Sequence, residues 1–276
     1  MTPLTLHILG TGGGRFVMIT QRRRTAGIRL VHGSTQVHID PGPGALVFSN
    51  WAGLSPQKLD GLIVTHCHPD HYCDAEVLIE AMSRGATRRR GTLAASRSVL
   101  HGNGCGPSIS AYHRSRVDRI EALGPGSSFE VGALRFTAVE ARHSDPDTVG
   151  LRLEAGGLGA VGYTSDTGHF PELGGLYEGV RLLVLCTMRP RGHPLRLHLS
   201  TDEALEIVER ARPGCVVLTH FGMRMLDAGP DDEAAFLQEE TGVPAVAARD
   251  GMRFTLAEGI EVAGPRKRDG TRVIDA

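Results

Sequence analysis

Residues 63–71 read IVTHCHPDH, so an apolar run ends in three histidines and an aspartate within six positions. Side chains of an extended chain alternate in direction, so His66 and His68 point one way and Cys67 the other. Pro69 then breaks the strand and places Asp70 and His71 in the first turn of a following helix. One pair of imidazoles can therefore share a cation, while Asp70 and His71 reach a second cation nearby. Imidazole and carboxylate suit Zn²⁺, Fe²⁺ or Mn²⁺, and the absence of thiolates argues against a purely structural zinc.

Short runs typical of β-strands continue on both sides of this loop, from residue 4 to residue 248. Helical spacing is clearest in residues 71–85 and 200–214, where the first segment follows the histidines directly. In the second, Ser200 and Glu203 have the offset of a capping box, and Pro213 and Gly214 end the helix. The strand runs are LTLHIL, GIRLV, TQVHID, GLIVT, LRFTAVEA, VGLRLEA, LGAVGYT, VRLLVLC, GCVVLTH and VPAVAA.

Two strand-rich halves, each with helices, predict an α/β fold in which a sandwich of two β-sheets is covered by helices. We expect residues 1–262 to form this single domain and residues 263–276 to form a polar tail.

Composition excludes several classes of protein. Thirty Lys and Arg balance thirty-one Asp and Glu, so the net charge gives no bulk attraction to nucleic acid or membrane. Five cysteines without a CxxC spacing fit neither a disulfide framework nor a zinc knuckle, which predicts reduced thiols and a cytoplasmic protein. No apolar run approaches the roughly 18 residues that a membrane span requires, and we expect no export signal or membrane anchor.

Other candidate motifs lie on both sides of the loop. His143 stands in ARHSDPDTVGLRL, Asp166 in GYTSDTG and His220 in VVLTHFG, while LGTGGG (residues 9–14) and VHIDPGPG with Asp40 precede it. With the HxHxDH pattern at residues 66–71, this order resembles the metallo-β-lactamase superfamily. The resemblance covers residues 4–256 and implies a four-layer αββα sandwich with mixed sheets.

The resemblance also implies two divalent metal ions, with zinc first and manganese or iron as alternatives. Asp166 would bridge the two ions, and a hydroxide shared between them would attack the substrate. Asp40 would orient a ligand histidine, and Asp70 counts as a ligand and a catalytic residue. The implied ligands are His66, His68 and His143 for one ion and Asp70, His71 and His220 for the other.

Residues 198–222, HLSTDEALEIVERARPGCVVLTHFG, are similar to the phosphodiesterase branch that includes ribonuclease Z and a cyclic phosphate phosphodiesterase. SDT at residues 165–167 is shared with this branch. A histidine opens a helix in these relatives, so His198 is a candidate general acid for the leaving alkoxide. Arg189, Arg191 and Arg196 precede it and are candidates for contact with phosphate oxygens, or are simply exposed.

These features predict a phosphodiesterase acting on a small or cyclic phosphodiester, a nucleotide or an RNA 3′ end. Only 22 residues separate His143 from Asp166, which leaves no room for the substrate-binding arm of ribonuclease Z. An acyl hydrolase of the same fold, such as a lactonase or thioesterase, and a non-catalytic metal-binding module stay open. A homodimer is also compatible with the sequence.

Overall fold

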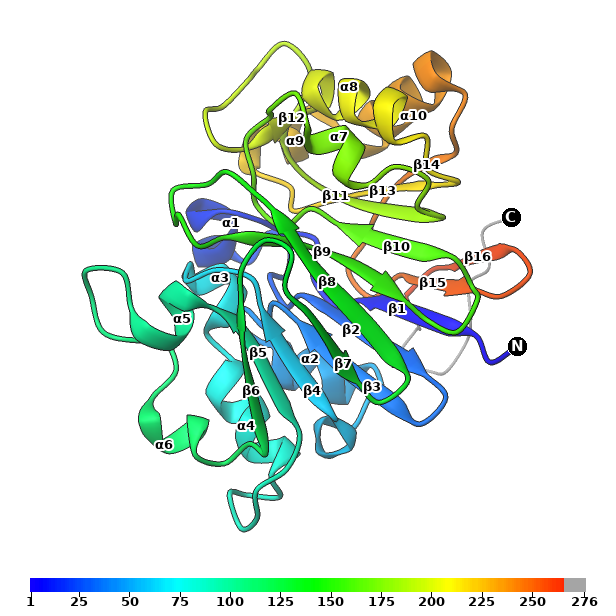
Figure 1. Ribbon diagram of the computed structural model, residues 1–276. Helices are drawn as coiled ribbons and strands as arrows, with labels where there is room; N and C mark the ends of the chain where they lie inside the picture. The colour runs from blue at the N-terminus through cyan, green and yellow to red at the C-terminus, as the bar shows by residue number, and fades with distance from the viewer. Residues whose placement is uncertain (266–276) are drawn as a thin grey trace.

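The computed structural model describes residues 1–265, which form two β-sheets packed face to face with helices on both outer sides (Figure 1). This arrangement confirms the α/β sandwich predicted above as a single domain. The expected polar tail, residues 263–276, lies outside the described residues from position 266 onward.

The first sheet is antiparallel at one end and parallel at the other. β1 lies between β2 and β15, so Leu4 pairs with both His32 and Leu256. The strands in spatial order are β16 (Ile260–Ala263), β15 (Arg253–Leu256), β1 (Leu4–Ile8), β2 (Ile28–His32), β3 (Thr35–Ile39), β4 (Gly61–Val64), β5 (Thr92–Ser96) and β6 (Arg119–Leu123).

The second sheet is mixed in the same way, with four parallel strands followed by antiparallel ones. A two-residue strand, β12 (Leu199–Ser200), pairs with the end of β11. The strands in spatial order are β14 (Ala245–Ala247), β13 (Val216–Thr219), β11 (Leu182–Arg189), β10 (Ala160–Tyr163), β9 (Val149–Glu154), β8 (Leu134–Glu140) and β7 (Ser128–Val131).

Each central strand is buried on both faces, and its residues alternate between two cores. In β11, Leu182 and Val184 pack between the sheets, whereas Leu183 and Leu185 pack under the outer helices. This burial explains why β11 reads as one continuous apolar run. The second sheet is covered by α7 (Leu173–Leu176), α8 (Thr201–Ala211), α9 (Met223–Ala228) and α10 (Pro230–Thr241).

The first sheet has its own outer core of aliphatic side chains from its strands and covering helices. The short helices α1 (Arg15–Thr20) and α3 (Pro69–Tyr72) lie instead at one edge of the sandwich, between the two halves (Figure 1). None of the helices within residues 1–265 is long and apolar enough to cross a membrane. The covering helices are α2 (Ala45–Trp51), η1 (Pro56–Lys58), α4 (Ala75–Met82), α5 (Arg97–His101) and α6 (Ala111–Arg114).

The two predicted helices have different outcomes. α8 begins after Ser200, whose side chain accepts from the Glu203 amide while the Glu203 carboxylate accepts from the Ser200 amide, which confirms the capping box. The segment after the histidines is divided into α3 and α4 at Cys73 and Asp74. There the Asp74 amide donates to the Pro41 carbonyl, and the Asp74 carboxylate accepts from the Leu46 amide, each at 2.9 Å.

Candidate metal centre

The loop after β4 brings the first four candidate residues to the edge between the sheets. His66 and His68 lie with their rings 4.8 Å apart, while Cys67 packs toward the outer core, as strand alternation predicts. Pro69 is the first residue of α3, so Asp70 and His71 occupy its first turn. Figure 1 shows α3 beside α1 at this edge.

The second sheet supplies the remaining candidates at the ends of separate strands. His143 follows β8, Asp166 follows β10, and His220 directly follows β13. The backbone is strained here, since Ser165 and His220 have positive φ angles of 55° and 60°, as does Asp40 after β3 at 51°. Such angles are costly for residues other than glycine and cluster at functional sites.

The structure gathers these side chains into overlapping sets whose candidate ligand atoms lie within 4.8 Å of one another. Two facing histidine pairs, His68 Nδ1 with His143 Nε2 and His71 Nε2 with His220 Nε2, are each separated by 3.1 Å. Two ligands of one tetrahedral zinc ion are roughly 3.3 Å apart, given zinc–nitrogen bonds of about 2.0 Å. The sets are His66, His68, His143 and Asp166; Asp70, His71 and His220; and Asp166, His198 and His220.

Asp166 lies between the sets. Its Oδ2 is 3.7 Å from the Nε2 atoms of both His71 and His143, and its Oδ1 is 3.1 Å from His220 Nε2. Oδ1 makes no hydrogen bond of suitable geometry, although His220 Nε2 is 3.1 Å away, and the buried His66 Nε2 has no hydrogen-bond partner within residues 1–265. Buried polar atoms are normally paired, so these orphaned atoms fit a centre that divalent cations complete.

The atoms of the histidines that face away from the centre are held in place. His71 Nδ1 donates to Asp40 Oδ2 at 3.0 Å, and His143 Nδ1 donates to the Leu197 carbonyl at 2.9 Å. Asp40 Oδ2 also accepts from the Tyr163 and Thr65 hydroxyls at 2.8 Å each. These bonds leave Nε2 of His71 and His143 free to bind a cation. Asp40 therefore lies where the sequence predicted, behind a histidine of the centre.

Asp145 is a supporting residue that the sequence did not reveal. Its Oδ2 accepts from the Cys67 amide at 2.9 Å and from the Ser98 hydroxyl, so it ties the loop of His66 and His68 to the segment after His143. Its place in HSDPD, two residues after His143, was the available signal.

The centre has a distinctive charge distribution. Burial would raise the pKa of Asp166, but His220 and His71 hold that pKa well below its usual range. Burial would lower the pKa of His71, but Asp166, Asp70 and Asp40 raise it to about 10. Burial, together with His71, lowers the pKa of His66. Asp166 is thus ionised and His66 neutral, as metal ligands must be, whereas His71 carries a proton in the metal-free protein that a bound cation would displace.

His198 reaches the same carboxylate. Its Nδ1 is 3.7 Å from Asp166 Oδ2, and its ring is 4.8 Å from that of His143. It lies two residues before the N-cap Ser200, just ahead of β12, so the expectation that it opens the helix is wrong by a few residues. β12 pairs with β11, and this pairing carries His198 toward the centre. Burial, with His220 and His143, lowers the pKa of His198 to about 4.

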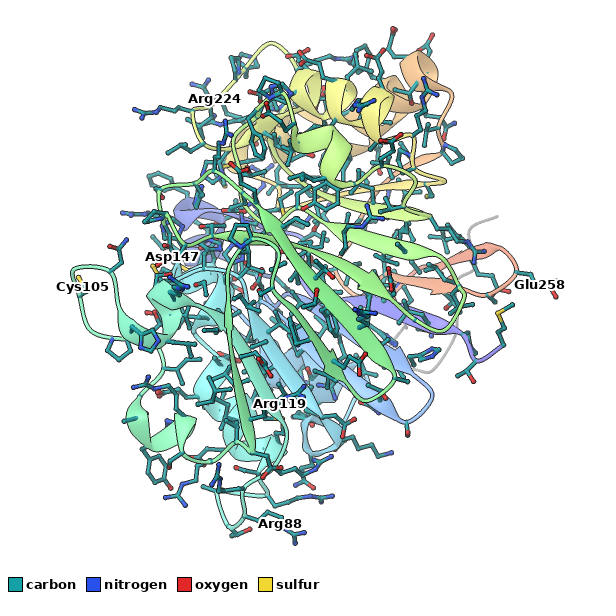
Figure 2. The ribbon with its side chains drawn as sticks, viewed as in Figure 1. Arg88, Cys105, Arg119, Asp147, Arg224 and Glu258 are labelled. Carbon is teal, nitrogen blue, oxygen red and sulfur yellow. The ribbon has the colours of Figure 1, made fainter. Side chains whose placement is uncertain are left out.

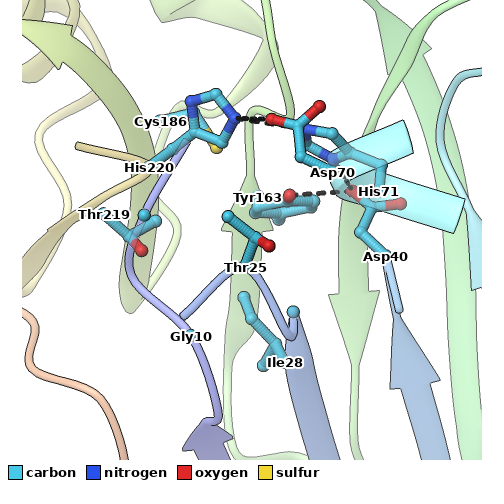
Figure 3. A pocket seen from close by; sticks show the side chains of 12 residues that line it. Gly10, Thr25, Ile28, Asp40, Asp70, His71, Tyr163, Cys186, Thr219 and His220 are labelled. Atoms are coloured by element: carbon cyan, nitrogen blue, oxygen red, sulfur yellow. Dashed lines mark hydrogen bonds and ion pairs between the residues drawn. The ribbon is translucent and has the colours of Figure 1, made fainter. Parts of the chain in front are cut away.

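A cleft and a small cavity, of very different volumes, adjoin the centre. A cleft of about 480 Å³ is lined by His68, Asp70, Asp166 and His198 together with apolar side chains that include Phe16 and Met188. A second cavity of about 20 Å³, enough for one water molecule, lies behind His71 and His220 (Figure 3). Figure 3 shows Tyr163 bonded to Asp40 on its wall and His220 facing Asp70.

The three candidate arginines have different positions. Arg189 lines the large cleft. Arg191 lies outside this lining, where its Nε is 3.3 Å from Glu233 Oε1 and its guanidinium stacks on Phe236. Arg196 is exposed and is not part of the lining either.

Two arginines of the cleft escaped the sequence analysis, Arg15 and Arg224. Each follows a motif that the sequence did single out, the glycine turn LGTGGG and the HFG after β13. The proximity of Arg15 and Arg224 to those motifs could therefore have identified them as candidates.

Comparison with known proteins agrees with this geometry. A family model described as the beta-lactamase superfamily domain matches residues 35–221. MJ1374 of Methanocaldococcus jannaschii, an uncharacterized protein, is 36% identical over 254 residues, covering 91% of this chain and 94% of that protein. Ribonuclease Z of Kineococcus radiotolerans is 29% identical over 230 residues, covering 76% of this chain and 72% of that enzyme.

Solved structures show the same fold. The metallo-β-lactamase fold protein YhfI from Bacillus subtilis superposes with a TM-score of 0.76 at 19% identity, covering 92% of this chain and all of that one (100%). A diphosphatase of the PhnP family superposes with a TM-score of 0.68 at 19% identity, covering 92% of this chain and 97% of that one.

Fold and centre together support a metal-dependent hydrolase built on an αββα sandwich. The chain belongs to the metallo-β-lactamase superfamily, in its ribonuclease Z-like branch.

Proposed function

We propose that the protein is a phosphodiesterase with two divalent metal ions, zinc in the first place and manganese or iron as alternatives. The observation that carries the proposal is the position of Asp166, within 4 Å of histidines from both ligand sets and of His198. The names of a ribonuclease Z and a diphosphatase among the similar proteins favour a phosphoester over an acyl substrate.

In this proposal His66, His68 and His143 would hold one ion, Asp70, His71 and His220 would hold the other, and Asp166, which lies between the two sets, would serve both. The ions, when bound, supply a water nucleophile at neutral pH and neutralise charge on the phosphoryl group. Asp40 and the Leu197 carbonyl fix the imidazole rings, and Gly14 donates its amide to Asp70 Oδ2 at 2.7 Å. The chain thus orients His71, His143 and Asp70 before metal or substrate arrives.

His198 acts in this proposal as the general acid that protonates the leaving alkoxide. Its pKa of about 4 in the free protein is too low for this role, so the negative charge of a bound phosphoester must raise that pKa before the imidazolium can donate its proton. Its side chain is 19% exposed and lines the large cleft, so it can reach a leaving group there. A general acid matters most when the leaving group is a poor one, because a good one departs without a proton.

Turnover of model substrates tests the proposal directly. Zinc-loaded protein is expected to hydrolyse bis(p-nitrophenyl) phosphate, and to act weakly on a panel of lactones and thioesters. Activity confined to the acyl panel would make the protein an acyl hydrolase of the same fold. A metal-loaded protein inert toward both panels would instead be a metal-binding module.

His198→Ala tests the acid role. We expect hydrolysis of a nucleotide alkyl ester to slow by about 100-fold or more, and that of the p-nitrophenyl ester to slow far less. His169→Ala is the matched control, since His169 pairs with Glu206 outside the cleft lining. Equal slowing of both esters by His198→Ala, with zinc content retained, would remove the role.

A cytoplasmic location is part of the proposal, because all five cysteines are free and two of them are buried among apolar side chains. Nucleotides and RNA ends are the substrates proposed for this compartment. The homodimer stays a prediction that sedimentation velocity can check.

A further inference from the structure

The carboxylate of Asp40 is buried where the two sheets meet. Exposed charged side chains such as Arg88, Arg119 and Glu258 extend from the surface in Figure 2, whereas Asp40 is only 2% exposed. A buried charge is costly unless hydrogen bonds satisfy it. The donors around Asp40 therefore determine where its carboxylate lies.

Four hydrogen bonds hold this carboxylate. Its Oδ1 accepts from the Thr65 amide at 2.8 Å, and its Oδ2 accepts from the hydroxyls of Thr65 and Tyr163 at 2.8 Å each. The fourth donor is His71 Nδ1, which is 3.0 Å from Oδ2. Asp40 and Thr65 follow β3 and β4 of the first sheet, whereas Tyr163 is the last residue of β10 in the second sheet. The bond from Tyr163 therefore joins the two sheets.

The direction of these hydrogen bonds follows from the carboxylate, which can only accept. Thr65 uses its one hydroxyl proton toward Asp40, so the Ser165 hydroxyl, 2.6 Å away, donates to Thr65. Burial, together with the charge of Asp40, raises the pKa of Tyr163 well above its usual range, so its hydroxyl keeps its proton and stays a donor. Two hydroxyls from the second sheet thus donate toward the first.

Tyr163 is held more firmly than the aspartate it contacts. Its backbone pairs with Leu151 of β9 and Val184 of β11, and its ring packs in the core between the sheets. Asp40 lies instead in a loop with a φ angle of 51°, which is strained for a residue other than glycine. A residue of a central strand therefore anchors a loop residue whose backbone conformation is unfavourable.

We propose that Tyr163 is a positioning residue of the metal centre: its hydroxyl holds the Asp40 carboxylate, and that carboxylate holds the imidazole of His71. One half of the molecule then controls the orientation of a candidate ligand in the other half. Outer partners of this kind set the ring orientation of a ligand histidine and its affinity for metal. The inference rests on the metal centre of the proposed function, but not on which bond is hydrolysed.

Tyr163→Phe removes the donor and keeps the ring in the core. We expect zinc affinity to fall about tenfold, the lower end of the range for losing an outer partner, because Thr65 still holds the carboxylate. Competition with a chromophoric chelator measures the dissociation constants of the bound zinc ions. Wild-type constants in this variant would overturn the inference.

Tyr177→Phe is the matched control. Tyr177 is fully buried as well, but its hydroxyl donates to the main-chain carbonyl of Tyr163, at 3.1 Å, instead of to a carboxylate. This variant should lose folding stability and retain wild-type zinc affinity. Equal losses of zinc affinity in the two variants would point to packing around β10 and would remove the role of the Tyr163 hydroxyl.

A double-mutant cycle shows whether Tyr163 acts through Asp40. Asp40→Gly removes the carboxylate and suits the positive φ angle at this position. If Tyr163 acts through Asp40, Tyr163→Phe should have little further effect on zinc affinity in the Asp40→Gly protein. Fully additive losses would contradict the inference.

Cobalt(II) in place of zinc gives a readout that serves even if the Asp40→Gly protein does not fold. Its visible absorption depends on the geometry of its ligands, so the spectrum should change in Tyr163→Phe and stay as in the wild type in Tyr177→Phe. An unchanged spectrum in Tyr163→Phe would overturn the inference alone. A wild type that binds neither zinc nor cobalt would overturn the metal centre of the proposed function, and this inference with it.

Discussion

The first sheet contributes four residues of the centre from one short stretch, His66 to His71, whereas the second sheet contributes single residues from the ends of separate strands. In the first half a side chain, that of Asp40, orients His71. In the second half a main-chain carbonyl, that of Leu197, orients His143. The group that orients His71 can therefore be removed by substitution. The group that orients His143 belongs to the main chain, so its position depends on the path of the backbone.

Asp166 joins the two halves, and its replacement should have the largest effect. Asp166→Asn keeps the shape of the side chain but removes the charge that faces histidines of both sets. We expect zinc content to fall for both ions and kcat to drop on the order of 1000-fold. Metal analysis by mass spectrometry of protein purified without chelator measures the content. His143→Ala, which removes a member of one set, should lose less metal, and the reverse ranking would contradict a shared role for Asp166.

Asp40 probes the first half alone. Asp40→Asn weakens the hydrogen bond that fixes His71, so zinc affinity should fall about 10- to 100-fold. Competition with a chromophoric chelator measures it. Asp118→Asn is the control, because Asp118 accepts from the Gly91 amide on the surface. An Asp40 variant with wild-type zinc affinity would show that the first half does not need its carboxylate.

Replacement of His38 distinguishes two sources of acid sensitivity in folding stability, the first sheet and the histidines of the centre. Burial, together with Arg29, lowers the pKa of His38 to about 3, and its Nε2 donates to the Ala26 carbonyl at 2.8 Å. Between pH 6.5 and pH 3 the unfolded chain binds a proton that the folded chain excludes, so stability falls as the pH falls. At pH 5 this amounts to about 2 kcal/mol.

His38→Gln should lose this part of the pH dependence. Urea unfolding at pH 7 and pH 5 measures the difference between the variant and the wild type. Identical losses of stability on acidification would assign the acid sensitivity to the histidines of the centre instead.

Replacement of Ser200, in the second half, is expected to have the smallest effect on the protein. Ser200→Ala removes the cap of α8 and should cost about 1 kcal/mol of folding stability. Zinc content should stay at the wild-type value, because Ser200 itself lies in none of the ligand sets. Loss of metal in this variant would show that the position of His198, two residues earlier, affects the metal sites.

The same contrast explains what the sequence could predict. The loop of His66 to His71 is visible from spacing alone, and continuous apolar runs such as β11 mark strands buried on both faces. β5 was missed because TLAAS has small residues, and β6 because RIEAL is mostly exposed; both become strands by pairing with neighbours. Arg15 and Arg224 were missed because only the packing of α1 and α9 at one edge brings them into the cleft.

The position of β1 between β2 and β15 also affects how the chain folds during its synthesis. Leu4 is synthesised about 250 residues before its partner Leu256, which follows every residue of the centre. Closing so long a loop is slow, and until then one edge of β1 has free amides and carbonyls that can pair with other chains. Nascent chains of this protein are thus most exposed to aggregation late in translation, when the centre's residues are already synthesised but the sheet beneath them is incomplete.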